Sequence, residues 1–261
     1  HPYDEWLNKN STNLSEYDLK KESPIKYDNE KLIAYKKFYG VSLEEEVDVI
    51  LPLAKLAVEG TGSMGDDTPM PVLSKQSRSL YDYFRQQFAQ VTNPPIDSLR
   101  ETSVMSLETC LGVERNLFDE SSLHAGRLIL DSPVLSNQVF KKLITYKKKG
   151  FSNDILSLHY DKNIDLEEAI NTICDRAVRS VKKGNVLIIL SDQDLNMDQL
   201  TIPAAMAVGA VHHRLINEGV RCDCNIIVET ASTWNSHHFA VLLGYGASAV
   251  YPYLAFNIIN D

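Results

Sequence analysis

Apolar positions follow two different patterns along the chain, and the change comes near residue 126. From there on, short apolar runs alternate with stretches of helical spacing. The runs are RLILDS, DILSLHY, NVLIIL, CNIIVET and SAVYPYL, with helices expected between them over 136–148, 165–183, 202–218 and 236–244. Strands separated by helices are typical of a parallel sheet built from right-handed crossovers. The pattern predicts an α/β fold whose parallel βα units resemble a partial (β/α) barrel. It does not decide between a closed barrel and an open sheet.

Before residue 126 the spacing is that of helices preceded by a polar arm. Residues 1–29 are rich in Asn, Ser, Asp and Lys, and we expect them to form an arm or linker from a preceding domain. An α/β domain with a helical N-terminal part is expected over 30–261. In addition to the helices at its start, helices are expected in SLYDYFRQQFAQV and near 97–111.

Two helices are expected between residues 30 and 58. The first ends at Gly40, a residue that favours the left-handed conformation after a helix. The second starts at a capping box of Ser42 and Glu45 and continues to Val58. Pro52 falls inside it, where a proline kinks a helix. The apolar face of this second helix consists of Leu43, Val47, Ile50, Leu51 and Ala54.

Composition and charge exclude several classes of partner. The chain has 261 residues, 44% of them hydrophobic, and a net charge of −9, which argues against a nucleic-acid or anionic-membrane partner. The uncharged stretch 239–256 is long enough to cross a bilayer. Its glycines and Pro252 instead predict a buried helix, a glycine turn and a buried strand. Four cysteines in a chain of this size indicate a reducing compartment, and we expect a cytoplasmic protein.

The segment GTGSMGDDTPMP, residues 60–71, has the glycine spacing of a dinucleotide-binding turn. Such a turn needs a strand before it and a helix starting within it, so that helix amides meet the pyrophosphate. Here a helix is expected before it, prolines follow, and two aspartates would repel phosphate. The segment is therefore interpreted as a rigid loop. Acidic segments elsewhere lack the glycine of a calcium loop, and no catalytic, cofactor-binding or metal-binding residue is predicted.

Polar residues gather at the ends of the predicted strands. They are His159, Tyr160, Ser191, Asp192, Glu229, Thr230 and Tyr251. In a (β/α) architecture, functional groups collect at the C-terminal ends of strands. No nucleophile and base can be paired among these residues, so the residues favour an interaction or scaffold domain. A stand-alone (β/α) enzyme and a small-ligand regulatory module remain as alternatives.

Several longer motifs resemble one family throughout the chain. They include SMGDDTPMPVLS at 63–74, YDYFRQQFAQVTNPPIDSLRE at 81–101, AVGAVHHRLI at 207–216 and HHFAVLLGYGASAVYPYLAF at 237–256. These motifs resemble the central domain of the glutamate synthase large chain. The segment ETASTWNSHHFA looks more like the ferredoxin-dependent form of cyanobacteria and plastids than the NADPH-dependent form.

The resemblance implies a non-catalytic role within a larger enzyme. In that family an N-terminal amidotransferase domain hydrolyses glutamine, and ammonia passes through a tunnel to an FMN-binding barrel with an iron–sulfur cluster. The central domain joins these two domains and helps form the tunnel. The ammonia that the tunnel delivers is used to make L-glutamate from 2-oxoglutarate. The resemblance thus implies no cofactor in this domain, an inactive isolated chain, and ferredoxin or an NADPH-oxidising subunit as the partner of the parent enzyme. The location implied is the cytoplasm or the plastid stroma.

The rigid loop is the expected contact with the tunnel. A tunnel wall needs backbone that approaches closely without bulky side chains, and it must stay rigid. The residues that meet this need are Thr61, Gly62, Ser63, Met64, Gly65, Asp66 and Asp67. The alternative is a turn that only packs between two neighbouring domains.

Overall fold

The computed structural model describes residues 2–14, 26–60, 69, 71–75, 78–85, 97–148, 150–194, 196 and 198–260. Its first half contains α1 (Tyr3–Asn10), β1 (Thr12–Asn13), α2 (Asn29–Tyr39), the π-helix η1 (Glu45–Ile50), α3 (Leu51–Leu56), η2 (Leu80–Tyr83), α4 (Ser98–Val104), β2 (Thr109–Leu111), η3 (Ser122–Ala125) and β3 (Leu128–Leu130). The second half contains α5 (Asn137–Thr145), β4 (Asn153–Ser157), β5 (His159–Asp161), α6 (Leu166–Lys182), β6 (Leu187–Ser191), β7 (Gln199–Thr201), α7 (Ala204–Asn217), η4 (Arg221–Asp223), β8 (Asn225–Glu229), α8 (Ser236–Gly244), β9 (Ala249–Tyr251) and α9 (Tyr253–Ile259).

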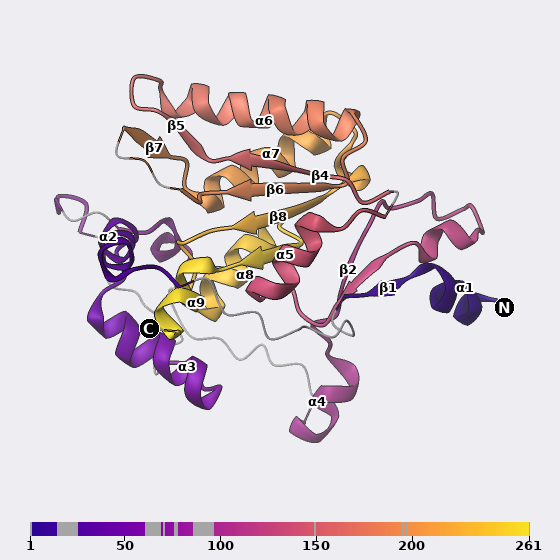
Figure 1. Cartoon of the computed structure of the whole chain (residues 1–261), viewed down its shortest axis with the longest axis horizontal. Helices are drawn as coiled ribbons and strands as arrows, with labels where there is room; N and C mark the ends of the chain where they lie inside the picture. The colour runs from indigo at the N-terminus through magenta and orange to yellow at the C-terminus, as the bar shows by residue number, and fades with distance from the viewer. Residues whose placement is uncertain are drawn as a thin grey trace.

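A parallel four-stranded sheet forms the centre of the molecule (Figure 1). Its strand order is β4-β6-β8-β9, so each strand lies beside the strand of the next βα unit. This is the order that successive right-handed crossovers produce, as in part of a (β/α) barrel. The α/β fold class predicted from the sequence is confirmed.

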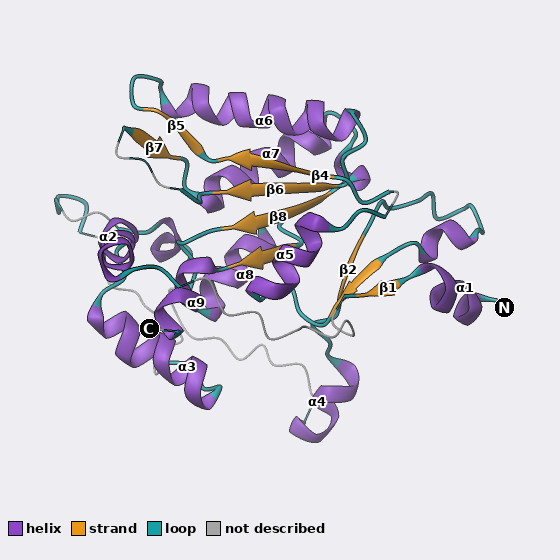
Figure 2. Ribbon diagram, in the orientation of Figure 1, coloured by secondary structure: helices purple, strands orange, loops and turns teal. Residues whose placement is uncertain are grey.

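Both faces of this sheet are covered, which explains why its strands are continuous apolar runs. Leu187, Ile189 and Ile227 pack in one cluster with α5. Their neighbours Ile188 and Leu190 point the other way and pack in a second cluster with α6, α7 and α8. The helices therefore lie in two layers on opposite faces of the sheet (Figure 2).

Helix α5 covers the face of the sheet opposite to that of α6, α7 and α8. The reason is that the connection containing α5 crosses the sheet in the opposite direction to the other connections. Residues 133–135 join the sheet beside β9, where Leu135 N–H donates to Val250 O at 2.8 Å and Val250 N–H donates to Pro133 O at 2.7 Å. From that edge, α5 carries the chain to β4 at the far edge. A right-handed crossover that runs the opposite way places its helix on the opposite face. Within the described residues β4 pairs only with β6, so the sheet is open and not a closed barrel.

The first predicted strand belongs to a different sheet. RLILDS supplies β3, which pairs parallel to β1 and antiparallel to β2 in a separate three-stranded sheet. The assignment of this run to the parallel sheet is wrong, and residues 133–135 take that place. DILSLHY also divides into two strands, β4 and β5, and β5 pairs with β7. Residues 1–29 were expected to be an extended arm, yet α1 and β1 lie within them.

The N-terminal helices follow the predicted boundaries with one local change. Helix α2 ends at Gly40, whose φ of 74° is left-handed, as predicted. The second helix widens to a π-helix over Glu45–Ile50, where Leu51 N–H donates to Glu46 O, five residues back. Pro52 comes directly after this turn and lacks an N–H, and its ring excludes a carbonyl of the preceding turn. A wider turn relieves that conflict.

Three further segments differ from expectation or refine it. The helix predicted near 97–111 ends at Val104, and β2 follows. Of the helix predicted in SLYDYFRQQFAQV, only the 3₁₀ turn η2 lies in the described residues, which end at residue 85 there. The uncharged stretch 239–256 forms the end of α8, a turn, β9 and the start of α9. In the described part of the chain, no helix has the length and apolar character to cross a membrane.

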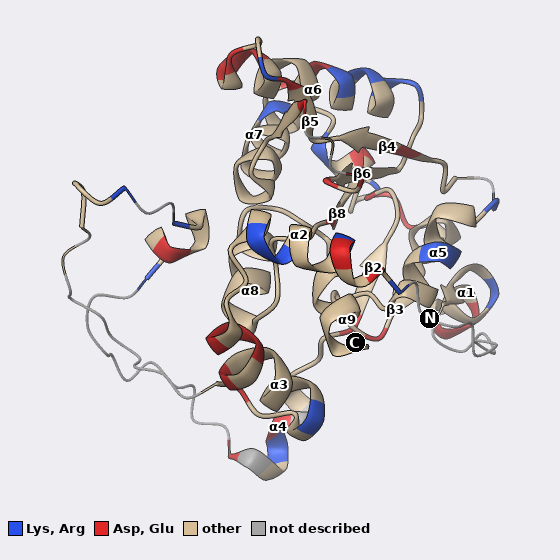
Figure 3. Ribbon diagram, turned by 60° about the vertical axis from the view of Figure 1, so that its left-hand side comes forward, with Lys and Arg blue, Asp and Glu red and all other residues tan. Residues whose placement is uncertain are grey.

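Charged residues are distributed along the helices and not gathered on the sheet (Figure 3). Helix α6 has Glu167 and Glu168 in its first turn and Arg179 and Lys182 in its last. Acidic residues near the N-terminus and basic residues near the C-terminus both interact favourably with the helix dipole. The charges therefore help to hold this exposed helix, while apolar packing builds the centre.

Candidate functional site

The polar residues predicted at the strand ends do lie together at one edge of the parallel sheet. The strand register pairs Ser157 with Ser191, Ser191 with Glu229, and Glu229 with Tyr251. All four therefore lie in one row on the face that α5 covers. Asp192 and Thr230 come one residue later, beyond the strands. The predicted ring thus divides into two groups: the row on the strands lines one cavity, and Asp192 lines another.

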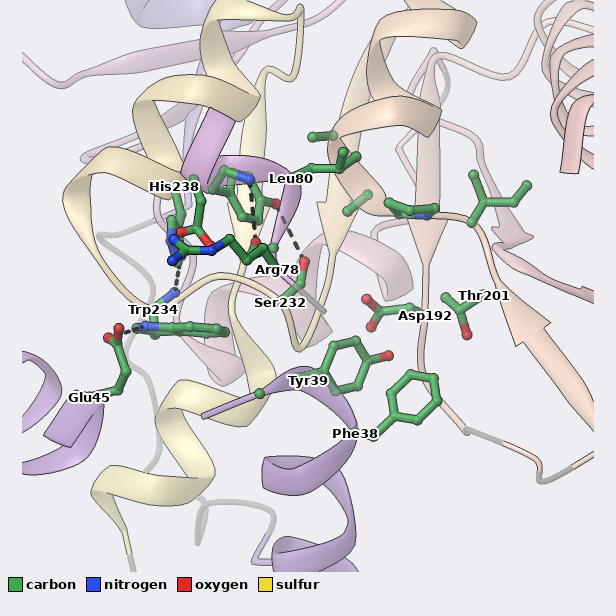
Figure 4. A pocket seen from close by; sticks show the side chains of 18 of the residues that line it. Phe38, Tyr39, Glu45, Arg78, Leu80, Asp192, Thr201, Ser232, Trp234 and His238 are labelled. Atoms are coloured by element: carbon green, nitrogen blue, oxygen red, sulfur yellow. Dashed lines mark hydrogen bonds between the residues drawn. The ribbon is translucent and has the colours of Figure 1, made fainter. Parts of the chain in front are cut away.

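The first cavity lies between the end of α2, η2 and the start of α7 (Figure 4). Its volume is about 580 Å³. Asp192 lines it and is 1% exposed. The Thr230 hydroxyl and the Ala231 N–H both donate to the Asp192 carboxyl, the latter at 3.0 Å. Burial raises the pKa of Asp192 to about 6, although these hydrogen bonds act in the opposite direction.

A row of hydroxyl groups extends from Asp192 into the cavity wall. Thr230 Oγ1 lies 2.9 Å from Ser232 Oγ, which lies 3.4 Å from the Tyr81 hydroxyl. The Tyr81 hydroxyl also lies 3.3 Å from Thr233 Oγ1. Each of these groups has a partner within the protein. Such a connected network of hydroxyl groups fixes the shape of a core.

His238 belongs to the same wall, and it is held as a neutral ring. It stacks on Tyr81 with ring centres 4.3 Å apart, and Trp234 meets it edge-on at 4.7 Å. Burial lowers the pKa of His238 to about 3. Trp234 in turn donates from its indole nitrogen to Glu45 at 2.8 Å (Figure 4). This contact ties the π-helix to the start of α8, so the residues of this cavity stabilise the fold.

The second cavity is a groove of about 610 Å³ between α5 and the row of polar side chains, and we name it the α5 groove. Ser191 donates to Glu229 Oε2 at 2.6 Å. Tyr251 stacks on Phe140 and donates from its hydroxyl to Asn137 Oδ1 at 3.0 Å. Burial raises the pKa of Glu229 to about 7. The groove therefore holds a buried carboxyl that is partly protonated near neutral pH.

Sequence reasoning found the strand ends of this groove but missed Asn137. Asn137 lies 114 residues from Tyr251 along the chain and meets it because residues 133–135, just before α5, pair with β9. No local pattern marks such a residue. The strand-end position of Tyr251 was the one signal available.

The predicted contact loop Thr61–Asp67 lies outside the described residues, but its first flank, Gly60, is described. A Cβ at Gly60 would lie 2.9 Å from Asp48 O and 3.3 Å from Val49 Cγ2, so glycine is needed for this close approach. A cavity of about 220 Å³ lies beside Gly60 and is also lined by Asn235, Ser236 and His237. Gly60, the last described residue before the loop, therefore lies beside the π-helix and the start of α8.

The histidine pairs serve local contacts. His212 accepts a hydrogen bond from Arg221 Nε at 2.9 Å, and His237 Nε2 lies 3.0 Å from Tyr81 O. Gly246 packs on the His212 ring so closely that any Cβ would clash, and its φ of 110° also favours glycine. Among the described residues, no group of three or more His, Cys, Asp or Glu side chains is placed to hold a metal ion.

Comparison with known proteins identifies the family. The family model for the glutamate synthase central domain matches residues 34–261. The chain belongs to this family. It is 40% identical over 98% of its length to the chloroplastic ferredoxin-dependent glutamate synthase of Oryza sativa subsp. japonica, and 39% identical over its whole length to ferredoxin-dependent glutamate synthase 2 of a Synechocystis strain. It is 38% identical over 98% of its length to the glutamate synthase [NADPH] large chain of Bacillus subtilis. The chain spans 16%, 17% and 16% of these three proteins, respectively.

This glutamate synthase central domain exposes apolar side chains on α1 and on α2 and α3, and these helices lie at opposite ends of the molecule (Figure 1). The N-side surface lies at α1 and η3 and consists of Tyr3, Leu7, Leu117, Phe118 and Leu123. The C-side surface lies at α2, η1 and α3 and consists of Ile33, Phe38, Leu43, Val47, Leu51 and Leu56. The second surface includes three of the five residues of the predicted apolar helix face. Of those five residues, only Ile50 is buried.

Proposed function

We propose that the chain is the connector of a glutamate synthase, linking the glutamine amidotransferase domain to the FMN-binding synthase domain and helping to form the ammonia tunnel. The observation that carries this proposal is the pair of exposed apolar surfaces at opposite ends of the domain. Soluble domains rarely leave contiguous apolar patches in water unless another protein surface covers them. A connector needs two such surfaces, one for each neighbour.

Each surface lies near one terminus of the chain. The N-side surface includes α1, the first helix, and Phe118 there is 96% exposed. The C-side surface lies beside the C-terminus, since α9 packs on α2 and η1. In a longer protein, a domain attached at either end of this chain would therefore start next to one of the two apolar surfaces. On this proposal residues 1–29 lead from the amidotransferase domain, and 30–261 form the connector.

The parent enzyme would make L-glutamate from L-glutamine and 2-oxoglutarate. The connector contributes no catalytic residue and holds no cofactor in this scheme. FMN and the iron–sulfur cluster belong to the synthase domain, so the 261-residue chain is inactive alone. Ferredoxin is the favoured electron donor, because the segment around Trp234 is similar to the ferredoxin-dependent form, with an NADPH-oxidising subunit as the other candidate. The corresponding compartments are the cytoplasm and the plastid stroma.

The loop Thr61–Asp67 is the proposed contact with the tunnel. Support comes from its flank, because Gly60 packs on the backbone of η1 and lies beside the start of α8. Both neighbours are helical, so the loop starts from a rigid base. A rigid base suits a tunnel wall, since a wall that moved would let ammonia escape.

A substitution at Gly62 tests the tunnel proposal in the full-length enzyme. Gly62→Val would narrow the passage, so glutamine-dependent glutamate synthesis should fall about tenfold or more, while synthesis from added ammonia persists. Gly244→Val is the control, because a Cβ at Gly244 meets no atom within 4 Å. The control should leave both activities within about twofold of the unmodified enzyme. Equal loss of both activities in Gly62→Val would show that the loop serves folding instead.

A further inference from the structure

The α5 groove contains a buried donor that nothing in the described protein satisfies. Asn137 Nδ2 is shielded from solvent and has no hydrogen-bond partner among the described residues. The other amide atom, Oδ1, accepts from the Tyr251 hydroxyl at 3.0 Å. A buried amide donor without a partner is costly. An acceptor brought by a ligand would remove that cost.

The same groove contains a buried carboxyl without a cation. Glu229 is 8% exposed, and its hydrogen-bond partners, the Ser191 hydroxyl and the Gln193 side chain, are both neutral. No Lys or Arg in the described part of the chain forms an ion pair with Glu229. Nearby Asp192 and Asp194 add negative charge, which disfavours ionisation of Glu229 further. A positively charged ligand group would complete this end of the groove.

The remaining walls of the groove are basic and apolar. Arg176 lines the groove, is exposed, and forms no ion pair within the described chain. Lys141 adds a second positive charge. Ile155 lies on a strand of the central sheet, yet 47% of it is exposed, and it faces the groove together with Ile144. The groove thus combines a site for a cation, a site for an anion and an apolar wall.

We propose that the α5 groove binds a free α-amino acid with an aliphatic side chain. Its α-ammonium group would pair with Glu229, and its α-carboxylate would accept from Asn137 Nδ2 near the charge of Arg176. The side chain would cover Ile155. A 2-oxo acid lacks the cation that Glu229 requires, and a simple amine lacks the acceptor that Asn137 requires. This binding is independent of the connector role and involves no chemical step.

Calorimetry on the whole 261-residue chain tests the ligand class. The probes are L-leucine and L-methionine, with 4-methyl-2-oxopentanoate and isopentylamine as analogues of leucine that lack the ammonium or the carboxylate. Leucine or methionine should bind saturably at one site, and each analogue should bind at least about tenfold more weakly. Equal binding of either analogue, or no saturation with either amino acid, would overturn the proposal.

Variants assign the binding to this groove. Glu229→Gln removes the negative charge, and Asn137→Ala removes the donor, so each should weaken binding about tenfold or more. Ile155→Trp leaves the buried polar groups unchanged. Because Ile155 is partly exposed, the larger Trp side chain fills the groove. It should abolish binding while circular dichroism shows an unchanged fold. Glu167→Gln is the matched control, because Glu167 lies on the exposed first turn of α6.

Nuclear magnetic resonance supplies a readout that a folding defect cannot imitate. The side-chain amide signals of Asn137, assigned by their loss in Asn137→Ala, should shift on adding L-leucine to the unmodified chain. Leucine binding that leaves these signals in place would locate the ligand elsewhere and refute the α5 groove as its site.

Discussion

Asp192 and Glu229 are two buried carboxyls at the same edge of the sheet, yet their surroundings differ. Asp192 receives hydrogen bonds from Thr230 and from the Ala231 backbone, and the hydroxyl row behind it is fully connected. Glu229 interacts with Ser191 and Gln193 and faces a groove in which Asn137 Nδ2 has no partner among the described residues. Burial alone therefore does not separate a structural carboxyl from one available for binding. The number of satisfied partners does.

Removing the Asp192 carboxyl should have the largest effect on stability. Asp192→Ala removes the acceptor that the Thr230 hydroxyl and the Ala231 N–H share and leaves the Ala231 N–H buried without a partner, which should cost about 3 kcal/mol of unfolding free energy. Urea unfolding of the 261-residue chain measures this cost. Glu229→Gln should cost about 1 kcal/mol or less, because Gln keeps an acceptor for Ser191. Asp154→Ala on β4 controls for loss of an acidic side chain. Equal costs for Asp192→Ala and Glu229→Gln would contradict the distinction drawn between the two carboxyls.

The two carboxyls should also differ in the pH range over which they affect stability. Folding raises the pKa of Asp192 from 3.8 to about 6 and that of Glu229 from 4.5 to about 7. A raised carboxyl pKa means that the folded state binds more protons, so stability falls as pH rises toward the folded value. The fall between pH about 6 and 7 should belong mainly to Glu229, with a slope of about 1 kcal/mol per pH unit.

Glu229→Gln tests this assignment. Urea unfolding as a function of pH should show that the variant loses the upper part of the pH dependence and keeps the lower part. The titratable and charged groups around this edge are Lys141, His159, Arg176, Asp192, Asp194 and Tyr251. If the unfolding free energy of Glu229→Gln still falls with pH above about 6, one of these other groups is responsible for the fall.

Sequence periodicity predicted the sheet well, because strands buried on both faces are apolar throughout. It did not predict which helix faces are covered. Leu43 and Val47 have the spacing of a buried face but are 71% and 50% exposed. Spacing shows that residues share a face, whereas burial depends on what lies opposite, and here nothing within the described chain covers them.

Two other differences from the sequence prediction have the same origin in long-range packing. The run RLILDS has the composition of a strand in either sheet, and only its partners β1 and β2 place it in the smaller one. The polar row at the strand ends was predicted because strand ends are local features. Asn137 was not, because its contact depends on the long-range pairing of residues 133–135 with β9.

Removing the Tyr251 hydroxyl should have the smallest effect of the substitutions considered, because it removes one hydrogen bond and keeps the ring. Tyr251→Phe keeps the ring that stacks on Phe140 but removes the hydrogen bond to Asn137 Oδ1. Thermal and urea unfolding should show a loss of about 1 kcal/mol. The amide of Asn137 would then be free to turn, so affinity for L-leucine should fall about threefold or more, which calorimetry measures. Tyr146→Phe is the control, since its hydroxyl contacts Thr12 at 3.3 Å, outside the α5 groove. A loss of stability in Tyr251→Phe with unchanged affinity would mean that Asn137 supports the fold and does not orient a ligand.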